Sequence, residues 1–308
     1  MTHRSRRLRR RTVAASVLTL GLLVGVSAVA VNAFELRDKL SNLERKIELL
    51  VDPPPDRVIA AAVRVTPEPE EVEEDLTADP TVAPSLAAGE TAPPAPTATP
   101  RPQKVKVDVN LLKKPDKWFI SQLDKESCAV AGTQMVLALH GKGDLSESFQ
   151  HQLERRIDEW ESRRDSLNGG WGPSAIVNAL EAYGVHGYEV RAYDTRGLAL
   201  RDAARSISKY HAPVILLSWR GAHTWVMTGY RADGDPLAFK SAKVSGAYIL
   251  DPWYPRVSTI WGASDRPGTY QDAAEMRRNY LAWKRPEGHY PDRDGLFIAV
   301  VPTQALNR

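Results

Sequence analysis

The stretch SQLDKESCAVAGTQMVLALHG, from Ser121 to Gly141, contains the only cysteine in the 308 residues of the chain. Cys128 stands where a helix is expected to begin, because Ala129 to His140 carry apolar residues at helical spacing and Gly141 follows as a stop signal. A lone cysteine usually packs as a small buried hydrophobic residue. At the first turn of a helix, however, unpaired N–H groups and the helix dipole favour a thiolate. The position of Cys128 therefore predicts either a structural thiol or a nucleophile.

A thiolate nucleophile needs a histidine to exchange protons with it and a third group to orient that histidine. Of the seven histidines, His223 is the one that opens an apolar strand pattern, AHTWVMTGY. Asp251 ends the next such pattern, in YILDPWYP. Two neighbouring antiparallel strands bring the start of one beside the end of the other, so Asp251 is expected to bond one imidazole nitrogen while the other faces Cys128. The alternative is that Asp251 only forms the turn before Pro252.

Acyl-transfer chemistry also needs N–H donors for the oxygen anion that develops in the transition state. Gln122 offers a side-chain N–H six residues before Cys128, and the backbone N–H of Cys128 offers a second. The alternative is that Gln122 is an ordinary loop residue. No cysteine or histidine accompanies His140 or His151 at the spacing of a metal site, so neither histidine is expected to bind a metal.

The three motifs together resemble the papain-like cysteine peptidases. In particular, QLDKESC before a helix, HTWVMTGY on a strand and ILDP after the next strand are similar to stand-alone relatives of the bacteriocin-processing, double-glycine peptidases, which are family 39 of the cysteine class. The resemblance runs from about Lys104 to Pro302. It implies an α+β, papain-like fold in which a helical part carries the cysteine and an antiparallel sheet carries the histidine and the aspartate.

The resemblance also implies a role for each site residue. Cys128 is then the nucleophile, His223 the general base and later the acid, Asp251 the residue that orients the histidine, and Gln122 a donor to the oxyanion. It implies no metal and no cofactor. The chain departs from the family pattern beside the cysteine, where Ser127 and Ala129 replace an acidic residue and a glycine. Both residues are small, so access for a substrate is still expected.

The sequence therefore predicts a cysteine peptidase that hydrolyses bonds in peptide or protein substrates. One alternative is an inactive papain-like module that binds peptide or cell-wall material. Another is a transglutaminase or other acyltransferase on the same fold. The loops around the motifs carry no readable code for the substrate.

The packed part of the chain is expected at 104–308. All eight tryptophans lie at or beyond Trp118, and twelve of the 22 prolines fall between Pro53 and Pro102. Helical patterns come first and strand patterns later, which is typical of α+β domains. The helices are expected at 129–140, 145–160, 174–183 and 198–210, and the strands at 105–109, 188–193, 213–219, 222–231, 247–250 and 296–301. The segment 253–295, rich in Trp, Tyr and Pro, has no predicted role.

The N-terminus carries the features of a membrane anchor. The formal net charge of the chain is +3, and six arginines within residues 1–12 contribute +6 to it. The rest of the chain therefore carries a net charge of −3, which argues against a nucleic-acid partner. Residues 13–33 are uncharged and long enough to span a bilayer. The basic segment is expected to stay cytoplasmic, which makes this a single-pass cell-membrane protein with its catalytic domain outside the cytoplasm. The alternative is secretion after cleavage of a signal peptide.

Two further segments separate this anchor from the domain. Residues 34–51 read as a short amphipathic helix, and a seven-residue apolar repeat within 36–50 is compatible with a weak homodimer or with a helix lying on the membrane. Residues 52–103, rich in Pro, Ala, Thr and Glu, are predicted to be a disordered linker that holds the domain away from the membrane.

Overall fold

The computed structural model describes residues 56–59, 61–67, 103–166, 171–284 and 287–305, all within the unit Asp56–Arg308. The predicted anchor at 13–33 and the heptad segment at 36–50 lie outside the described residues. Across the part of the chain that is described, no helix is both long enough and apolar enough to cross a bilayer.

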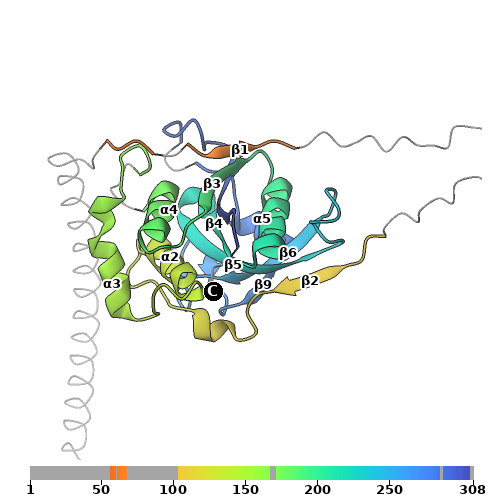
Figure 1. Ribbon diagram of the computed structural model, residues 1–308, viewed down its shortest axis with the longest axis horizontal. Helices are drawn as coiled ribbons and strands as arrows, with labels where there is room; N and C mark the ends of the chain where they lie inside the picture. The colour runs from red at the N-terminus through yellow and green to blue at the C-terminus, as the bar shows by residue number, and fades with distance from the viewer. Residues whose placement is uncertain (1–55, 60, 68–102, 167–170, 285–286, 306–308) are drawn as a thin grey trace, which may run out of the picture. The chain divides into compact units, whose positions relative to one another are not determined.

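A mixed sheet forms the centre of the described structure (Figure 1). Its strands follow the order β1-β3-β10-β4-β5-β6-β9, and β2 pairs with β5 outside this path. The neighbours are antiparallel except β1 and β3, which run parallel. The strands are β1 (Val63–Val65), β2 (Val107–Asn110), β3 (Tyr188–Tyr193), β4 (Val214–Ser218), β5 (His223–Ala232), β6 (Val244–Leu250), β9 (Thr269–Asp272) and β10 (Phe297–Pro302).

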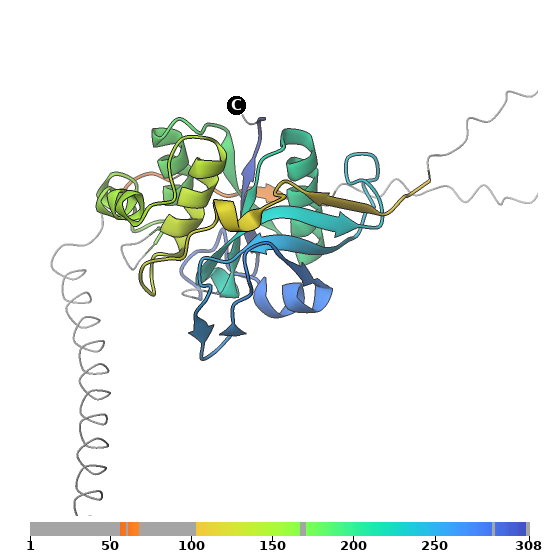
Figure 2. The ribbon, with the colours of Figure 1, turned by 90° about the horizontal axis from the view of Figure 1, so that it is seen from below.

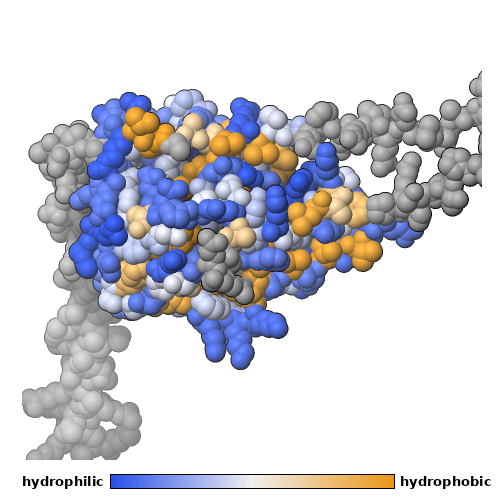
Figure 3. Space-filling model, in the orientation of Figure 1, coloured by the Kyte–Doolittle hydropathy of each residue, from blue (hydrophilic) through white to orange (hydrophobic). Residues whose placement is uncertain are grey.

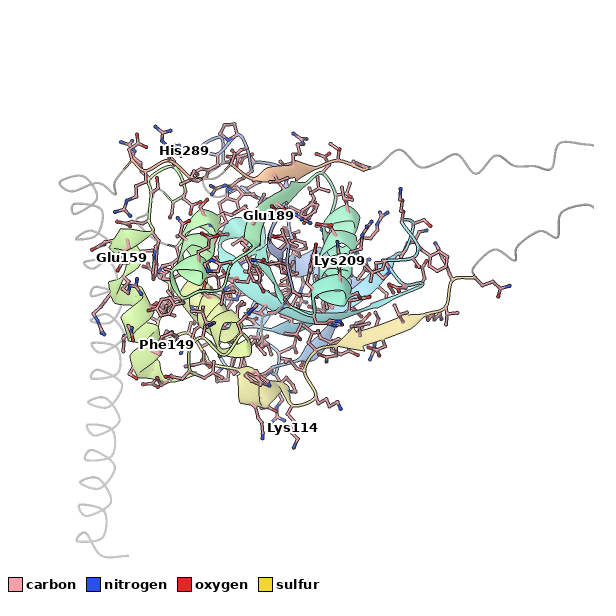
Figure 4. All side chains as sticks on the ribbon, in the orientation of Figure 1. Lys114, Phe149, Glu159, Glu189, Lys209 and His289 are labelled. Carbon is pink, nitrogen blue, oxygen red and sulfur yellow. The ribbon has the colours of Figure 1, made fainter. Side chains whose placement is uncertain are left out.

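Helices cover both faces of this sheet. On one face α2 packs on β5 and α4 on β3, while α3 packs on α2; on the other face lie α5 and α6. Figure 4 marks the two sides by Phe149 on α3 and Lys209 on α5. The helices are α2 (Cys128–Leu139), α3 (Glu147–Arg155), α4 (Pro173–Ala182), α5 (Arg196–Tyr210) and α6 (Ala273–Asn279), with the short 3-10 helices η1 (Pro115–Trp118), η2 (Ile157–Glu159) and η3 (Trp219–Gly221).

The central strands are apolar on both sides because each side meets a helical layer. In β4, Ile215 and Leu217 join the core beneath α2 and α4, whereas Val214 and Leu216 join the core beneath α5 and α6. Successive strand residues point to opposite faces, so an uninterrupted apolar run is what a sheet buried on both faces requires. On the face seen in Figure 3, polar side chains predominate and the apolar ones form separate patches.

The predicted α+β class is confirmed, and the arrangement of one sheet with five helices fits a papain-like peptidase fold. The ten predicted helices and strands all appear, with the helix predicted at 145–160 divided into α3 and η2. The segment 253–295, which had no predicted role, contains the hairpin β7 (Val257–Ser258) to β8 (Gly262–Ala263), then β9 and α6. Figure 2 shows this hairpin as two short blue arrows that project from the domain.

The structure differs from the sequence prediction in the segment 52–103. That segment was expected to be linker throughout, with the domain starting at 104, yet Val63–Val65 pairs in parallel with Arg191–Tyr193 of β3. Ser162 Oγ donates to the carbonyl of Arg57, and Arg64 forms an ion pair with Asp194. The folded unit therefore includes residues near Asp56, and β1 (orange in Figure 1) forms one edge of the sheet.

Candidate active site

The start of α2 is fixed by the side chain of Asp124. Its Oδ1 accepts the backbone N–H of Glu126 at 2.7 Å and of Ser127 at 2.9 Å, and also the hydroxyl of Ser127 at 2.9 Å. Short polar side chains hold turns in this way because they replace backbone partners locally. The chain then enters α2 with Cys128 as its first helical residue, so the thiol lies where N–H groups of the first turn are unpaired.

Close packing of α2 on β5 brings Cys128 to the start of that strand. Gly132, one turn further along α2, faces Thr224, and a Cβ atom on Gly132 would lie 2.8 Å from Thr224 Cγ2. Any larger residue would push the helix away from the strand. Cys128 consequently lies beside His223 and Thr224, and both residues interact with its thiol.

His223 and Asp251 meet across the pair β5–β6. Leu250 at the end of β6 lies opposite Val226 of β5, which places Asp251 beside the first residues of β5. Nε2 of His223 donates to Oδ1 of Asp251 at 2.7 Å, and both side chains are buried. The same Oδ1 accepts the backbone N–H of Trp253 at 2.9 Å. Asp251 therefore both shapes the turn and bonds the imidazole, so the two alternatives for this residue are compatible.

The thiol and the imidazole form a coupled pair. Burial raises the pKa of the Cys128 thiol, but the hydrogen bond and positive charge of His223, together with hydrogen bonds from Thr224, outweigh it and lower that pKa below its ordinary value. Burial lowers the pKa of His223, yet the charge and hydrogen bond of Asp251 and the contact with Cys128 raise it to about 9. The pair therefore favours a thiolate facing an imidazolium. Cys128 as a residue is half-buried, so it is not enclosed in the core as the following residues of α2 are.

Gln122 lies beside the aspartate end of this group. Its backbone N–H donates to the carbonyl of Pro252 at 2.9 Å, and Arg256 donates to the carbonyl of Gln122 at 2.6 Å. The side-chain Nε2 donates one N–H to the carbonyl of Asp124 at 2.6 Å. An amide carries two such hydrogens, and Asp124 uses one of them. The buried Gln150 supports this loop by accepting from Leu123 N and donating to Ser121 O.

Aromatic rings surround the imidazole. Trp219 stacks on His223 with ring centroids 4.1 Å apart and planes 21° apart, and Trp253 meets the imidazole edge-on at 6.4 Å. Trp261, on the hairpin β7–β8, stacks in turn on Trp219 at 5.6 Å. Neither the Trp219 contact nor the roles of Asp124 and Thr224 were predicted from the sequence. Asp124 could have been found as an aspartate whose side chain bonds backbone N–H groups two and three residues further on, as turn-forming residues do.

No group of three or more metal-binding side chains occurs within the described ranges. His140 lies in a different environment, at the other end of α2, where Nε2 is 3.1 Å from the hydroxyl of Tyr188. Burial lowers the pKa of His140 to about 4. That histidine is therefore neutral at ordinary pH and belongs to the packing of α2.

A comparison with protein-family models covers the region that contains all four site residues. Residues 116–285, more than half of the chain, match the Peptidase C39 like family. A comparison with curated proteins gave no match. The matched region begins just before Gln122 and ends just after α6, so it includes the Cys128–His223–Asp251 group and most of the sheet around it. The chain belongs to the Peptidase C39 like family.

Proposed function

We propose that this protein is a cysteine peptidase that cleaves peptide bonds with Cys128, His223 and Asp251. The observation that carries the proposal is the grouping of three side chains: the thiol of Cys128 interacts with His223, and Nε2 of the buried His223 bonds the buried carboxylate of Asp251. A structural cysteine needs neither a histidine partner nor a carboxylate behind it. Family membership supports the same activity, because a peptidase family model spans these residues.

The proposed mechanism follows from these positions. The Cys128 thiolate attacks the scissile carbonyl carbon, and the oxygen anion that forms is stabilised by the backbone N–H of Cys128 and the free amide hydrogen of Gln122. The imidazolium of His223 gives its proton to the departing amine as the C–N bond breaks. Water then attacks the thioester, and His223 takes a proton from that water. The C–S bond breaks, the acid product leaves, and the Cys128 thiolate and His223 imidazolium are restored. Asp251 holds the ring and balances its charge throughout.

Peptide cleavage by matched variants tests this proposal. The full-length protein is incubated with a peptide library, and products are identified by mass spectrometry for the wild type, C128A and C128S. Cleavage by the wild type and loss in both variants are expected, since neither variant offers a thiolate. Binding of peptides without cleavage by the wild type would instead support the inactive binding module. Addition of an amine acceptor distinguishes hydrolysis from acyl transfer, because a transferase yields the amide product.

We also propose that the peptidase domain lies outside the cytoplasmic membrane, anchored by residues 13–33. The uncharged length of this span and the arginines before it support the proposal. Because the chain has a single cysteine, a membrane-impermeant thiol reagent applied to intact cells reports on Cys128 alone. Labelling of the wild type but not of C128A is expected. N-terminal sequencing of the mature protein separates an anchor from a cleaved signal, and labelling that requires cell lysis would contradict this location.

A further inference from the structure

Trp219 contacts His223 more closely than any other aromatic side chain in the described structure. It is the first residue of η3, directly after β4 and four residues before the histidine, and its ring covers one face of the imidazole. Both side chains are buried, with exposed fractions of 8% for Trp219 and 2% for His223. A flat ring against the face of an imidazole leaves it little freedom to rotate about its Cβ–Cγ bond, whereas Asp251 restrains a single nitrogen.

A hydrogen bond from α6 holds the indole in this position. The Nε1–H of Trp219 donates to Oδ1 of Asn279 at 3.1 Å, and this contact is buried. Asn279 Nδ2 in turn donates to the backbone carbonyl and to Oε2 of Glu275, each at 3.2 Å. Because a buried donor without a partner is costly, this bond selects one orientation of the indole. A chain of contacts therefore runs from α6 to the imidazole.

The backbone before His223 adopts an uncommon conformation, and this conformation also places the ring of Trp219 against the imidazole. Trp219 and Arg220 have φ angles of 50° and 64°, in the left-handed region that residues with a Cβ atom rarely occupy. Gly221 continues the turn at 86°, and a Cβ atom there would lie 2.3 Å from the ring of Trp283. Such strain persists where the surrounding structure enforces it, and it concentrates at functional sites. Filling a core with an indole would not require it.

The stack also favours the charged form of the histidine. The face of an indole carries negative potential and attracts a cation. The indole also keeps water away from one face of the ring, and this burial acts in the opposite direction by lowering the pKa of His223. The protonated state of His223 is the one that faces the thiolate before attack and that protonates the leaving amine.

We propose that Trp219, oriented by Asn279, is a positioning residue that holds the imidazole of His223 in line with Cys128 and stabilises its protonated form. The proposal rests on the proposed function of His223 and adds α6 to the structure on which catalysis depends. Trp219 is not a catalytic residue, because it acts through the imidazole. Substitution should therefore alter proton affinity and turnover more than substrate affinity.

The test uses the full-length variants W219F, W219L, N279L and W219F/N279L. The variant W160F is the matched control, because Trp160 is equally buried but packs against Trp171 and Tyr183. Three quantities are measured: the pH dependence of Cys128 alkylation by iodoacetamide, kcat and KM on a cleaved peptide, and Tm. Alkylation reports on one site because the chain has one cysteine.

For W219L, the acid limb of the alkylation profile is expected to move up by about one pH unit. At a pH on the acid limb, a fall in kcat of up to roughly tenfold and a KM changed less than about threefold are expected. W219F should recover most of the wild-type profile because it keeps a ring. N279L should produce a smaller shift that disappears in the W219F background, since Asn279 acts through the indole N–H.

The possible outcomes distinguish failure of the positioning role of Trp219 from failure of the proposed peptidase function. If W219L and N279L lower Tm as W160F does, but leave the alkylation profile and kcat as in the wild type, Trp219 is a core residue and the positioning role is wrong. If N279L has its full effect in the W219F background, the Asn279 part is wrong. If the wild-type cysteine itself reacts as an ordinary thiol, the proposed peptidase function fails, and the positioning role fails with it.

Discussion

Each residue of the site is held by contacts that also maintain the fold. Asp251 shapes the turn before Trp253 while it bonds His223, and Asp124 fixes the start of α2 while its carbonyl accepts from Gln122. Because these contacts are shared, a substitution at one site residue changes both reactivity and local structure. Measurements that separate reactivity from turnover are therefore the most informative at this scale.

The pH dependence of the reaction follows from the two shifted pKa values. The thiol of Cys128 has a lowered pKa and His223 a pKa raised to about 9. Below the thiol pKa the nucleophile is protonated, and above about 9 the imidazole has lost the proton needed by the leaving amine. The profile of kcat/KM should therefore rise at a pH below the ordinary thiol pKa and fall near pH 9. Alkylation of the wild type should persist at a lower pH than that of an ordinary thiol, whereas in H223A it should require a pH of about 8.5. The control is H151A, because His151 is exposed and should leave the alkylation profile unchanged. If H223A also leaves the alkylation profile unchanged, Cys128 and His223 do not form an ion pair.

Gln122 is predicted to affect turnover without affecting thiolate formation. Its amide contacts the carbonyl of Asp124 and makes no contact with the imidazole that would change the state of Cys128. In Q122A, loss of one oxyanion donor should lower kcat by roughly 10²-fold, while the rate of alkylation stays near the wild-type value. Steady-state kinetics and alkylation on the same preparation test this. Equal losses in both measurements would show that Gln122 supports the loop and not the oxyanion.

At the scale of elements, the distance between α2 and β5 decides whether the thiol reaches the imidazole. The two elements come from distant parts of the sequence and touch at Gly132 and Thr224. One edge of β5 pairs with β4 and then with β2, and the other edge pairs with β6 from Val226 onward. Because its neighbours hold β5 in the sheet, a larger side chain at the contact between Gly132 and Thr224 should displace α2 and not β5.

The variant G132A should separate α2 from β5. The added Cβ would lie 2.8 Å from Thr224 Cγ2, and overpacking of this kind costs about 1–3 kcal/mol. The free energy of unfolding and the alkylation rate of Cys128 should both fall. G132A/T224S removes the obstructing methyl group, keeps the hydroxyl beside the sulfur and should restore both. The control is G197A, since no atom lies within 4 Å of a Cβ at Gly197 in α5. If G132A behaves like G197A, the contact does not set the separation.

Most of the helices and strands that carry the site could be predicted from the sequence. The helix after Cys128 and the strand after His223 were predictable because their apolar patterns are long and end at clear signals. Trp219 was not, since its left-handed backbone is imposed by contacts with residues far along the chain. Likewise β9 and α6 are short, polar on one side and stabilised by their neighbours. The site residues were identifiable from their chemistry, whereas their supports depend on long-range packing.

At the scale of the whole molecule, ion pairs, hydrogen bonds and strand pairing connect segments that lie far apart in the sequence. Arg293 forms a fully buried ion pair with Asp165, whose other carboxylate oxygen accepts the N–H of Ala175 at the start of α4. Residues near Asp56 contact the loop before α4, and Val63–Val65 completes the sheet at β3. The boundary that composition suggested at 104 therefore passes through the folded unit.

A fragment that begins at 104 would leave the backbone of β3 without the strand that covers it. Bare edge strands offer unpaired N–H and C=O groups to other chains and promote aggregation. The fragment 104–308 should therefore self-associate with rising concentration, whereas 56–308 should stay monomeric under the same conditions. Light scattering after size-exclusion chromatography measures the difference, and a peptide of residues 56–67 added in excess should reduce it. Equal behaviour of the two fragments would show that β1 does not protect the edge. If the difference is found, solubility depends on a three-residue strand that composition alone assigned to a linker.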